Sequence, residues 1–83
     1  MNEVQVYCKP DCVQCEYTKK KLDEFQIPHV DLDVVAHPIF AEQLAERGVQ
    51  RLPYVVAGDQ TWTGFQYDKL KGLRAIADPS YGL

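Results

Sequence analysis

Two cysteines three positions apart, Cys12 and Cys15, are the residues of this chain with the clearest chemical potential. They follow a short extended pattern and precede a helical one. Residues three apart share a face of a helix, so the two thiols would be neighbours. A cysteine at a helix start meets unpaired backbone N–H groups and the positive end of the helix dipole, and both favour the reactive thiolate. The spacing therefore predicts a redox-active dithiol.

A third cysteine, Cys8, leaves two interpretations open. It is either a small buried residue at the end of a strand or a thiol that pairs with Cys12 under oxidation. With His29 or His37 as a further ligand, the three cysteines also leave open a metal-binding module, although no second C-x-x-C is present. Three cysteines clustered near one end do not fit a structural disulfide framework, which needs an even number spread along the chain.

The elements that must position these thiols follow from hydrophobic periodicity and turn residues. Strands are predicted at residues 3–7, 29–33, 52–57 and 61–63, with a hairpin turn at 58–60. Helices are predicted at residues 13–25, from Pro38 to a C-cap at Gly48, and at 67–77. The order βαβαββα predicts an α/β fold, namely a four-stranded mixed sheet with three helices. The residues expected on the buried side of the first helix are Val13, Tyr17, Leu22 and Phe25.

The composition indicates one small domain, at residues 1–77, followed by a tail at 78–83. A chain of 83 residues has room for a single modest core. The net charge of -3, without a basic block, argues against nucleic-acid binding. No apolar run is long enough to span a membrane, and the first residues lack the basic and apolar regions of a signal peptide. We therefore expect a cytoplasmic protein without nucleic-acid or membrane partners.

Three segments resemble the NrdH-type redoxins, which are glutaredoxin-like members of the thioredoxin superfamily. The segment K-P-D-C-V-Q-C at residues 9–15 is similar to the family's K-P-x-C-V-Q-C. Residues 52–58, L-P-Y-V-V-A-G, resemble x-P-V-V-V-x-G, and residues 62–68, W-T-G-F-Q-Y-D, resemble W-S-G-F-R-P-D. The resemblance extends over residues 4–77. The departures are Cys8 in place of the usual threonine, Thr63 in place of serine, and Gln66 and Tyr67 in place of arginine and proline.

The resemblance implies a thiol–disulfide oxidoreductase with the thioredoxin/glutaredoxin fold. Cys12 would attack a substrate disulfide, and Cys15 would then resolve the mixed disulfide. Pro53 would be cis, which would leave the N–H and C=O of Leu52 free to pair with an extended substrate strand. Supporting roles are expected for four further residues, Lys9, Trp62, Gly64 and Phe65. Lys9 would place a positive charge beside the nucleophilic thiol, and Trp62 would hold the turn at Gly64 with its indole N–H bonded.

The resemblance also implies partners. NrdH-type redoxins donate electrons to class Ib ribonucleotide reductase. Glutaredoxins that use glutathione carry a G-G-x-D-D-like segment near the last helix, whereas residues 63–67 here are T-G-F-Q-Y, without an acid. Thioredoxin reductase is therefore the expected reductant, and a glutathione-dependent glutaredoxin is the redox alternative. Because no G-x-G-x-x-G is present, we expect no bound nicotinamide or flavin cofactor. We also expect no bound metal, and a monomer that carries electrons on a Cys12–Cys15 disulfide.

Overall fold

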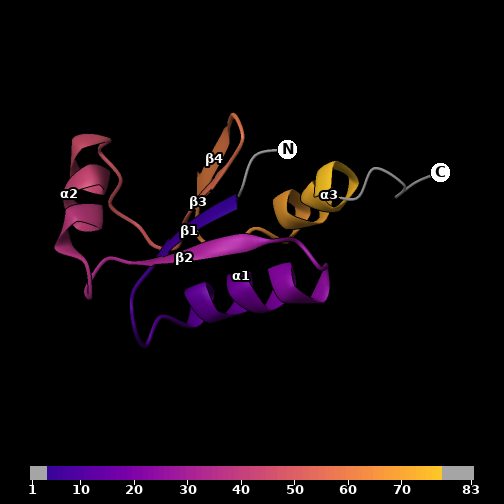
Figure 1. Ribbon diagram of the computed structural model, residues 1–83, viewed down its shortest axis with the longest axis horizontal. Helices are drawn as coiled ribbons and strands as arrows, with labels where there is room; N and C mark the ends of the chain where they lie inside the picture. Colours follow the sequence, from indigo (N-terminus) through magenta and orange to yellow (C-terminus); the bar gives the residue numbers. More distant parts are fainter. Residues whose placement is uncertain (1–3, 78–83) are drawn as a thin grey trace.

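The computed structural model describes the backbone of residues 4–77 and the side chains of residues 4–73. Its elements follow the predicted order (Figure 1): β1 (Val4–Cys8), α1 (Val13–Glu24), β2 (His29–Asp33), α2 (Pro38–Glu46), β3 (Tyr54–Ala57), β4 (Gln60–Thr63) and α3 (Tyr67–Ala77). The tail expected at 78–83 lies outside the described residues. No helix in the described part of the chain has the length and apolar character needed to cross a membrane.

The four strands form one mixed sheet in the order β2-β1-β3-β4. The β1 and β2 strands are parallel, because α1 carries the chain back to the starting edge between them. The β1–β3 and β3–β4 pairs are antiparallel. The β3–β4 turn is shorter than predicted: Ala57 pairs with Gln60, so Gln60 belongs to β4 and only Gly58 and Asp59 form the turn.

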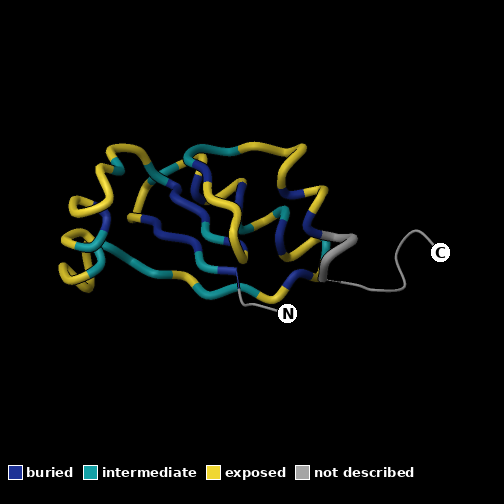
Figure 2. The backbone as a smooth tube through the Cα atoms, turned by 90° about the horizontal axis from the view of Figure 1, so that it is seen from above, coloured by how far each residue is buried: buried dark blue, intermediate teal, exposed yellow. Residues whose placement is uncertain are grey.

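The sheet separates two apolar clusters, as alternation along β1 requires. Val4, Val6 and Cys8 face one cluster, which includes Leu22 of α1 and Leu70 of α3. The opposite face of β1 presents Tyr7, which packs in a second cluster with Leu44 of α2. The helices α1 and α3 therefore cover one face and α2 covers the other. Figure 2 shows the buried segments along the central strands and the exposed segments on the outer turns of the helices.

The buried face of α1 differs from the prediction. Val13 and Tyr17 are 64% and 53% exposed, whereas the buried residues of the helix are Cys15, Thr18 and Leu22. These three recur at helical spacing, so they form a stripe in which two members are not strongly apolar. The Thr18 hydroxyl is satisfied because it donates to the Gln14 carbonyl oxygen at 2.8 Å. The prediction is confirmed for Leu22, and Phe25 packs against the same cluster, but it was wrong for Val13 and Tyr17 because it followed the most apolar side chains.

Candidate functional site

Cys12 occupies the N-cap position of α1, where the chain enters the helix. Its backbone is extended (φ -103°, ψ 110°), and the preceding Asp11 has a positive φ of 61°, which aspartate tolerates better than most residues. The Cys12 thiol is half-buried and packs at the margin of the core cluster that contains Cys15. This thiol therefore keeps access to solvent while it sits against the positive end of the helix.

The surroundings of Cys12 favour its thiolate. Burial disfavours the charged form, but hydrogen bonds from the Cys15 side chain and from the backbone of Cys15 and Gln14 outweigh it. The positive charge of Lys9 acts in the same direction. Together they hold the pKa of Cys12 below its ordinary value. Lys9 itself is exposed on the loop before the helix, where the sequence predicted a supporting charge.

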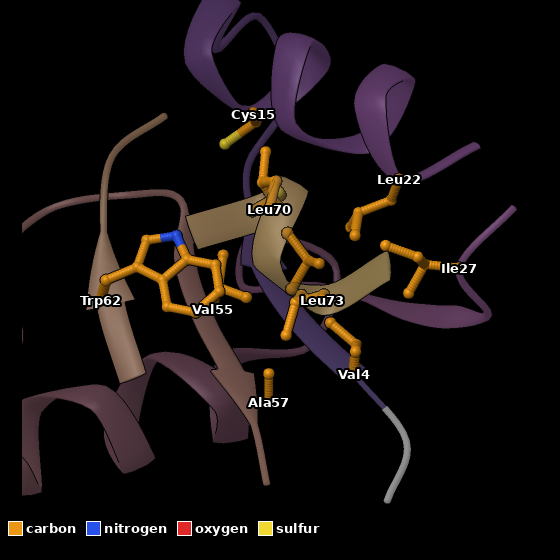
Figure 3. Close-up of a cluster of buried hydrophobic side chains, with 11 residues drawn as sticks. Val4, Cys15, Leu22, Ile27, Val55, Ala57, Trp62, Leu70 and Leu73 are labelled. Atoms are coloured by element: carbon orange, nitrogen blue, oxygen red, sulfur yellow. The ribbon is translucent and has the colours of Figure 1, made fainter. Parts of the chain in front are cut away.

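Cys15 is fully buried on the inner face of α1, where Figure 3 shows it directed into the core cluster. Burial raises the pKa of its thiol, and the hydrogen bond that it gives to Cys12 raises it further. A backbone hydrogen bond from Lys9 and a side-chain hydrogen bond from Cys8 act against this rise. The pair thus combines a reachable thiol of low pKa with a shielded thiol of high pKa. This combination suits an exchange by a dithiol, in which the accessible thiol attacks first and the buried thiol attacks the resulting mixed disulfide.

Cys8 is 4% exposed at the end of β1, which confirms the prediction of a small buried residue there. Its thiol interacts with Cys15, whereas the predicted alternative placed it beside Cys12. Alternation along β1 directs Cys8 into the core cluster, and Cys12 packs at the margin of the same cluster. The pairing of Cys8 with Cys12 under oxidation stays a prediction. Within residues 4–73, no three His, Cys, Asp or Glu side chains are grouped as metal ligands, and this includes the three cysteines with His29 and His37.

Leu52 and Pro53 lie at the same end of the sheet as Cys12. The β1 and β3 strands are antiparallel, so the residues after β1 and those before β3 meet there. The Leu52–Pro53 peptide bond is cis, as predicted, and Pro53 is buried. The Pro53 carbonyl accepts a hydrogen bond from the Gly64 N–H at 2.8 Å. Leu52 lies outside the β3 ladder, and its N–H and C=O have no hydrogen-bond partner among the described residues.

The loop between β4 and α3 contacts the dithiol segment through Gln14, a residue that the sequence prediction did not include. The Gln14 side-chain oxygen accepts a hydrogen bond from the Phe65 N–H at 3.2 Å. Gly64 has a φ of 80°, and a Cβ atom placed on it would lie 3.2 Å from the same oxygen. Gln14 therefore joins the start of α1 to a loop about fifty positions away. The available signal was its place between the two cysteines of the C-V-Q-C segment.

Trp62 and Phe65 pack beside the dithiol but do so differently. Trp62 is 5% exposed and belongs to the core cluster with Cys15 and Leu70, as Figure 3 shows. Its indole N–H has no hydrogen-bond partner within the described residues, so the prediction of a bonded N–H was wrong. Its neighbours in the cluster are mostly aliphatic side chains, which supply no acceptor, and the Lys69 Nζ atom lies 5.9 Å from the ring centroid. Phe65 is half-buried, and its ring centroid lies 5.9 Å from that of Tyr17 on α1.

The two departures after Phe65 take part in local packing. The Tyr67 ring, at the start of α3, lies 6.0 Å from the Phe25 ring and 5.7 Å from the Lys21 Nζ atom. The Gln66 side-chain amide donates to the Thr63 carbonyl oxygen at 2.9 Å. Tyr67 therefore packs the first turn of α3 against the end of α1. Tyr67 is also the last residue of the segment T-G-F-Q-Y, which contains no acidic residue.

Comparisons with known proteins agree with this geometry. The Glutaredoxin family model matches residues 4–62. The glutaredoxin-like protein NrdH of Escherichia coli strain K12 is 38% identical over 72 residues, which cover 84% of this chain and 86% of that protein. The NrdH protein of Lactococcus lactis subsp. cremoris is 33% identical over 70 residues, with coverage of 84% and 97%.

A solved structure is similar as well. The NrdH-redoxin of Escherichia coli, described as a glutaredoxin-like protein with a thioredoxin-like activity profile, superposes with a TM-score of 0.83 at 35% identity. The match covers 87% of this chain and 95% of the other. The fold, the cis-proline and the paired thiols thus occur in a chain that is similar to these proteins along most of its length. The chain belongs to the glutaredoxin family, among its NrdH-type redoxins, and is a thiol–disulfide oxidoreductase.

Proposed function

We propose that this protein carries electron pairs from thioredoxin reductase to a protein disulfide, with class Ib ribonucleotide reductase as its main acceptor. The observation that carries the proposal is the contrast between Cys12 and Cys15. A half-buried thiol of lowered pKa stands directly before a fully buried thiol of raised pKa. This contrast suits a carrier that attacks one disulfide at a time and keeps its second thiol for the release step.

In the proposed cycle, the Cys12 thiolate attacks one sulfur of the acceptor disulfide. A Cys12–acceptor bond forms, and the acceptor's other sulfur leaves as a thiolate. The Cys15 thiolate then attacks the Cys12 sulfur, so that the Cys12–Cys15 bond forms and the second acceptor sulfur is released. The acceptor gains two electrons and this protein loses two. Because the dithiol is the only redox group that the cycle needs, we propose that the protein works without a bound cofactor or metal. We also propose that it acts as a monomer.

Leu52 supports the docking of an extended acceptor segment. Its N–H and C=O are unpaired within the described residues and lie at the end of the sheet that carries Cys12. Unpaired groups at the edge of a ladder are available for pairing with an added strand. The Pro53 carbonyl already accepts a hydrogen bond from the Gly64 N–H. Leu52 is therefore the residue of this pair that offers an acceptor segment both a donor and an acceptor. Lys9 and Phe65 would border the docked segment.

The choice of thioredoxin reductase over glutathione rests on two observations. The similar NrdH-redoxin is described as thioredoxin-like in its activity profile. In addition, residues 63–67 lack the acids of glutathione-dependent glutaredoxins, and Tyr67 packs there on Phe25. We accordingly propose that this surface does not hold the amino end of glutathione.

Disulfide reduction measured with two reductants tests the proposal. The purified protein is supplied with NADPH and thioredoxin reductase in one assay, and with NADPH, glutathione reductase and glutathione in the other. Insulin and the class Ib reductase serve as acceptors. We expect turnover with thioredoxin reductase and little with glutathione. Activity in the glutathione assay alone would contradict the proposed electron source, and no activity on the reductase would contradict the proposed acceptor.

Two variants identify the thiols that attack in each step of the cycle. Cys12→Ser should abolish turnover, because it removes the attacking sulfur. Cys15→Ser should stop the cycle at a mixed disulfide that can be isolated with the acceptor. Retained turnover in Cys12→Ser would assign the attack to another thiol.

A further inference from the structure

Two cationic residues, Lys9 and Arg51, border Leu52 at the end of the sheet where the dithiol lies. The β1–β3 ladder ends with the pair Tyr7 and Tyr54. Continued by two positions, the same register sets Lys9 opposite Leu52, and Arg51 is the residue directly before Leu52. The backbone groups that would dock an acceptor segment therefore have one positive charge across from them and another beside them in the chain.

Both of these side chains are exposed, and within residues 4–73 neither forms an ion pair or a hydrogen bond. Two of the three lysines of α1, by contrast, are paired with acids. The Lys19 Nζ atom lies 3.6 Å from a Glu16 oxygen, and the Lys21 Nζ atom lies 2.8 Å from a Glu24 oxygen. A cation that no acid of its own chain neutralises is available to the carboxylate of another molecule. A guanidinium is especially suited, because it can bind a carboxylate through two parallel hydrogen bonds.

The acids at the same end of the molecule do not pair with these cations. Asp33 ends β2, and its Oδ1 atom accepts hydrogen bonds from the backbone N–H groups of Val35 and Ala36 at 2.8 and 2.9 Å. Asp11 is exposed on the loop before Cys12 and forms no ion pair with a described residue. The chain as a whole has a net charge of -3, so on average it repels an acidic partner. Attraction for an acid must therefore come from local, unneutralised cations.

We propose that Arg51 is a specificity-determining residue that, together with Lys9, selects extended acceptor segments with an acidic residue within two positions of the reacting cysteine. The inference rests on the proposed docking of the acceptor backbone on Leu52. Successive residues of a strand are about 3.3 Å apart, so an acid one or two positions from the cysteine stays within reach of a long arginine side chain. The exchange itself is unchanged, and Arg51 transfers neither a proton nor an electron.

The test uses short peptides whose single cysteine is bonded to thionitrobenzoate as a mixed disulfide. Three peptides are identical except for the two residues that flank the cysteine, which are both glutamate, both glutamine or both lysine. When the Cys12 thiolate attacks the peptide sulfur, the Cys12–peptide bond forms and thionitrobenzoate leaves with the electron pair, so its absorbance reports the rate. Each rate is divided by the rate of the same peptide with mercaptoethanol, which corrects for the intrinsic reactivity of the peptide.

In the parent protein we expect the glutamate peptide to react about twofold to fivefold faster than the glutamine peptide, the range of one exposed ion pair. The lysine peptide should be the slowest. Arg51→Gln should lower the ratio of the glutamate rate to the glutamine rate, and Arg51→Lys should keep most of it because the charge remains. Salt at about 0.5 M should lower the ratio in the parent protein, since it screens exposed charges.

Arg47 provides the matched control for these substitutions. It is an exposed arginine at the C-cap of α2, and it has no ion pair within residues 4–73. Arg47→Gln changes the net charge of the chain by the same amount as Arg51→Gln, but residues 48–51 separate it from Leu52. We expect the ratio of the glutamate rate to the glutamine rate to be the same in Arg47→Gln as in the parent protein.

The outcomes distinguish this inference from the proposed function. Thionitrobenzoate release that persists in Cys12→Ser would contradict the proposed attack by Cys12, whatever the peptide. With that attack established, equal corrected rates for the three peptides, or the same ratio in the parent protein and in Arg51→Gln, would overturn the selection by Arg51. An equal fall of the ratio in Arg47→Gln would overturn it as well, because the effect would then belong to the net charge. The salt series needs no variant, and a ratio that salt leaves unchanged would also contradict the inference.

Discussion

The three cysteines have the same side chain but three different environments. Cys12 faces the start of a helix and solvent, Cys15 lies on the inner face of that helix, and Cys8 ends a central strand. Hydrogen bonds and a nearby lysine favour the thiolate of Cys12, whereas burial keeps the other two protonated. Reactivity at this scale is therefore set by position, because the thiolate is the form that attacks.

Alkylation of the reduced protein should follow this ranking. With iodoacetamide, we expect Cys12 to be modified first, and its rate to level off at a lower pH than that of an ordinary thiol, because its pKa is lowered. Lys9→Gln should move this profile to higher pH, since it removes a positive charge, whereas Lys9→Arg should not. The shift should shrink at high salt, which screens exposed charges. Mass spectrometry of the modified peptides assigns the sites, and equal labelling of Cys8 or Cys15 would contradict the ranking.

The Gln14 side chain shows how one residue connects two elements. Its oxygen accepts from the Phe65 N–H, while the neighbouring Gly64 N–H is bonded independently to Pro53. Gln14→Ala should therefore raise the exchange rate of the Phe65 amide by about twofold to tenfold, since one hydrogen bond is lost. The Gly64 amide in the same sample is the internal control. Hydrogen-exchange NMR measures both, and an unchanged Phe65 rate would show that the contact does not protect this loop.

Among the elements, the loop between β4 and α3 depends on a glycine. Gly64 has a positive φ of 80°, and a Cβ there would meet the Gln14 oxygen at 3.2 Å. We expect Gly64→Ala to lower the free energy of unfolding by about 1–2 kcal/mol, the usual strain of a side chain in this region. Urea unfolding at neutral pH measures the change.

Gly72 provides the matched control for that substitution. It lies within α3, and a Cβ placed on it has no atom within 4 Å. Gly72→Ala should raise the free energy of unfolding by about 0.5–1 kcal/mol, because alanine loses less entropy in a helix. If both substitutions destabilised the protein equally, the strain at Gly64 would not be the cause.

The order and type of the elements could be predicted because each carries a local signal. Alternation marks β1, Pro38 marks the start of α2, and the turn at Gly58 marks the β3–β4 hairpin. The buried face of α1 could not, since its stripe contains a cysteine and a threonine, and the apolar Val13 and Tyr17 lie on the surface. Local patterns rank side chains by hydrophobicity, but the tertiary neighbours decide which of them are covered.

The site was predictable only in part for a similar reason. The spacing of the two cysteines indicated the dithiol directly, whereas the cis-proline was predicted only through the resemblance of residues 52–58 to the NrdH-type redoxins. The contact from Gln14 to Phe65 joins positions 51 apart, and no local pattern announces it. The same holds for Cys8, whose neighbour Cys15 is determined by the packing of α1 on β1. Contacts between elements thus had to come from the structure.

For the whole molecule, the buried thiols link stability to pH. The pKa values of Cys8 and Cys15 are raised in the folded protein, so the unfolded chain loses these protons first, near pH 8.5. The contribution of these two thiols to the free energy of unfolding is complete below that pH and is lost as the pH rises above it. Cys12, with a lowered pKa, acts oppositely: its contribution grows as pH approaches 8.5 and is constant beyond.

We therefore expect the reduced protein to lose stability above about pH 8.5, by up to about 1.4 kcal/mol per pH unit for each buried thiol. Oxidation to a Cys12–Cys15 disulfide should remove the part of this pH dependence that is due to Cys15. Cys8→Val should remove the part that is due to Cys8. Urea unfolding across the alkaline range measures the slope. A slope that is the same in the reduced, oxidised and Cys8→Val proteins would assign the loss to other groups.

The position of Cys15 directly behind Cys12 affects how well the protein resists irreversible oxidation. Peroxide that reaches the protein meets Cys12 first, because the other two thiols are sealed in the core. The sulfenic acid formed there would condense with the adjacent Cys15 to a disulfide before it could advance to the irreversible sulfinic and sulfonic acids. Damage would then end in the same oxidised form that ordinary turnover produces, and the reductant that serves the cycle would also repair the protein.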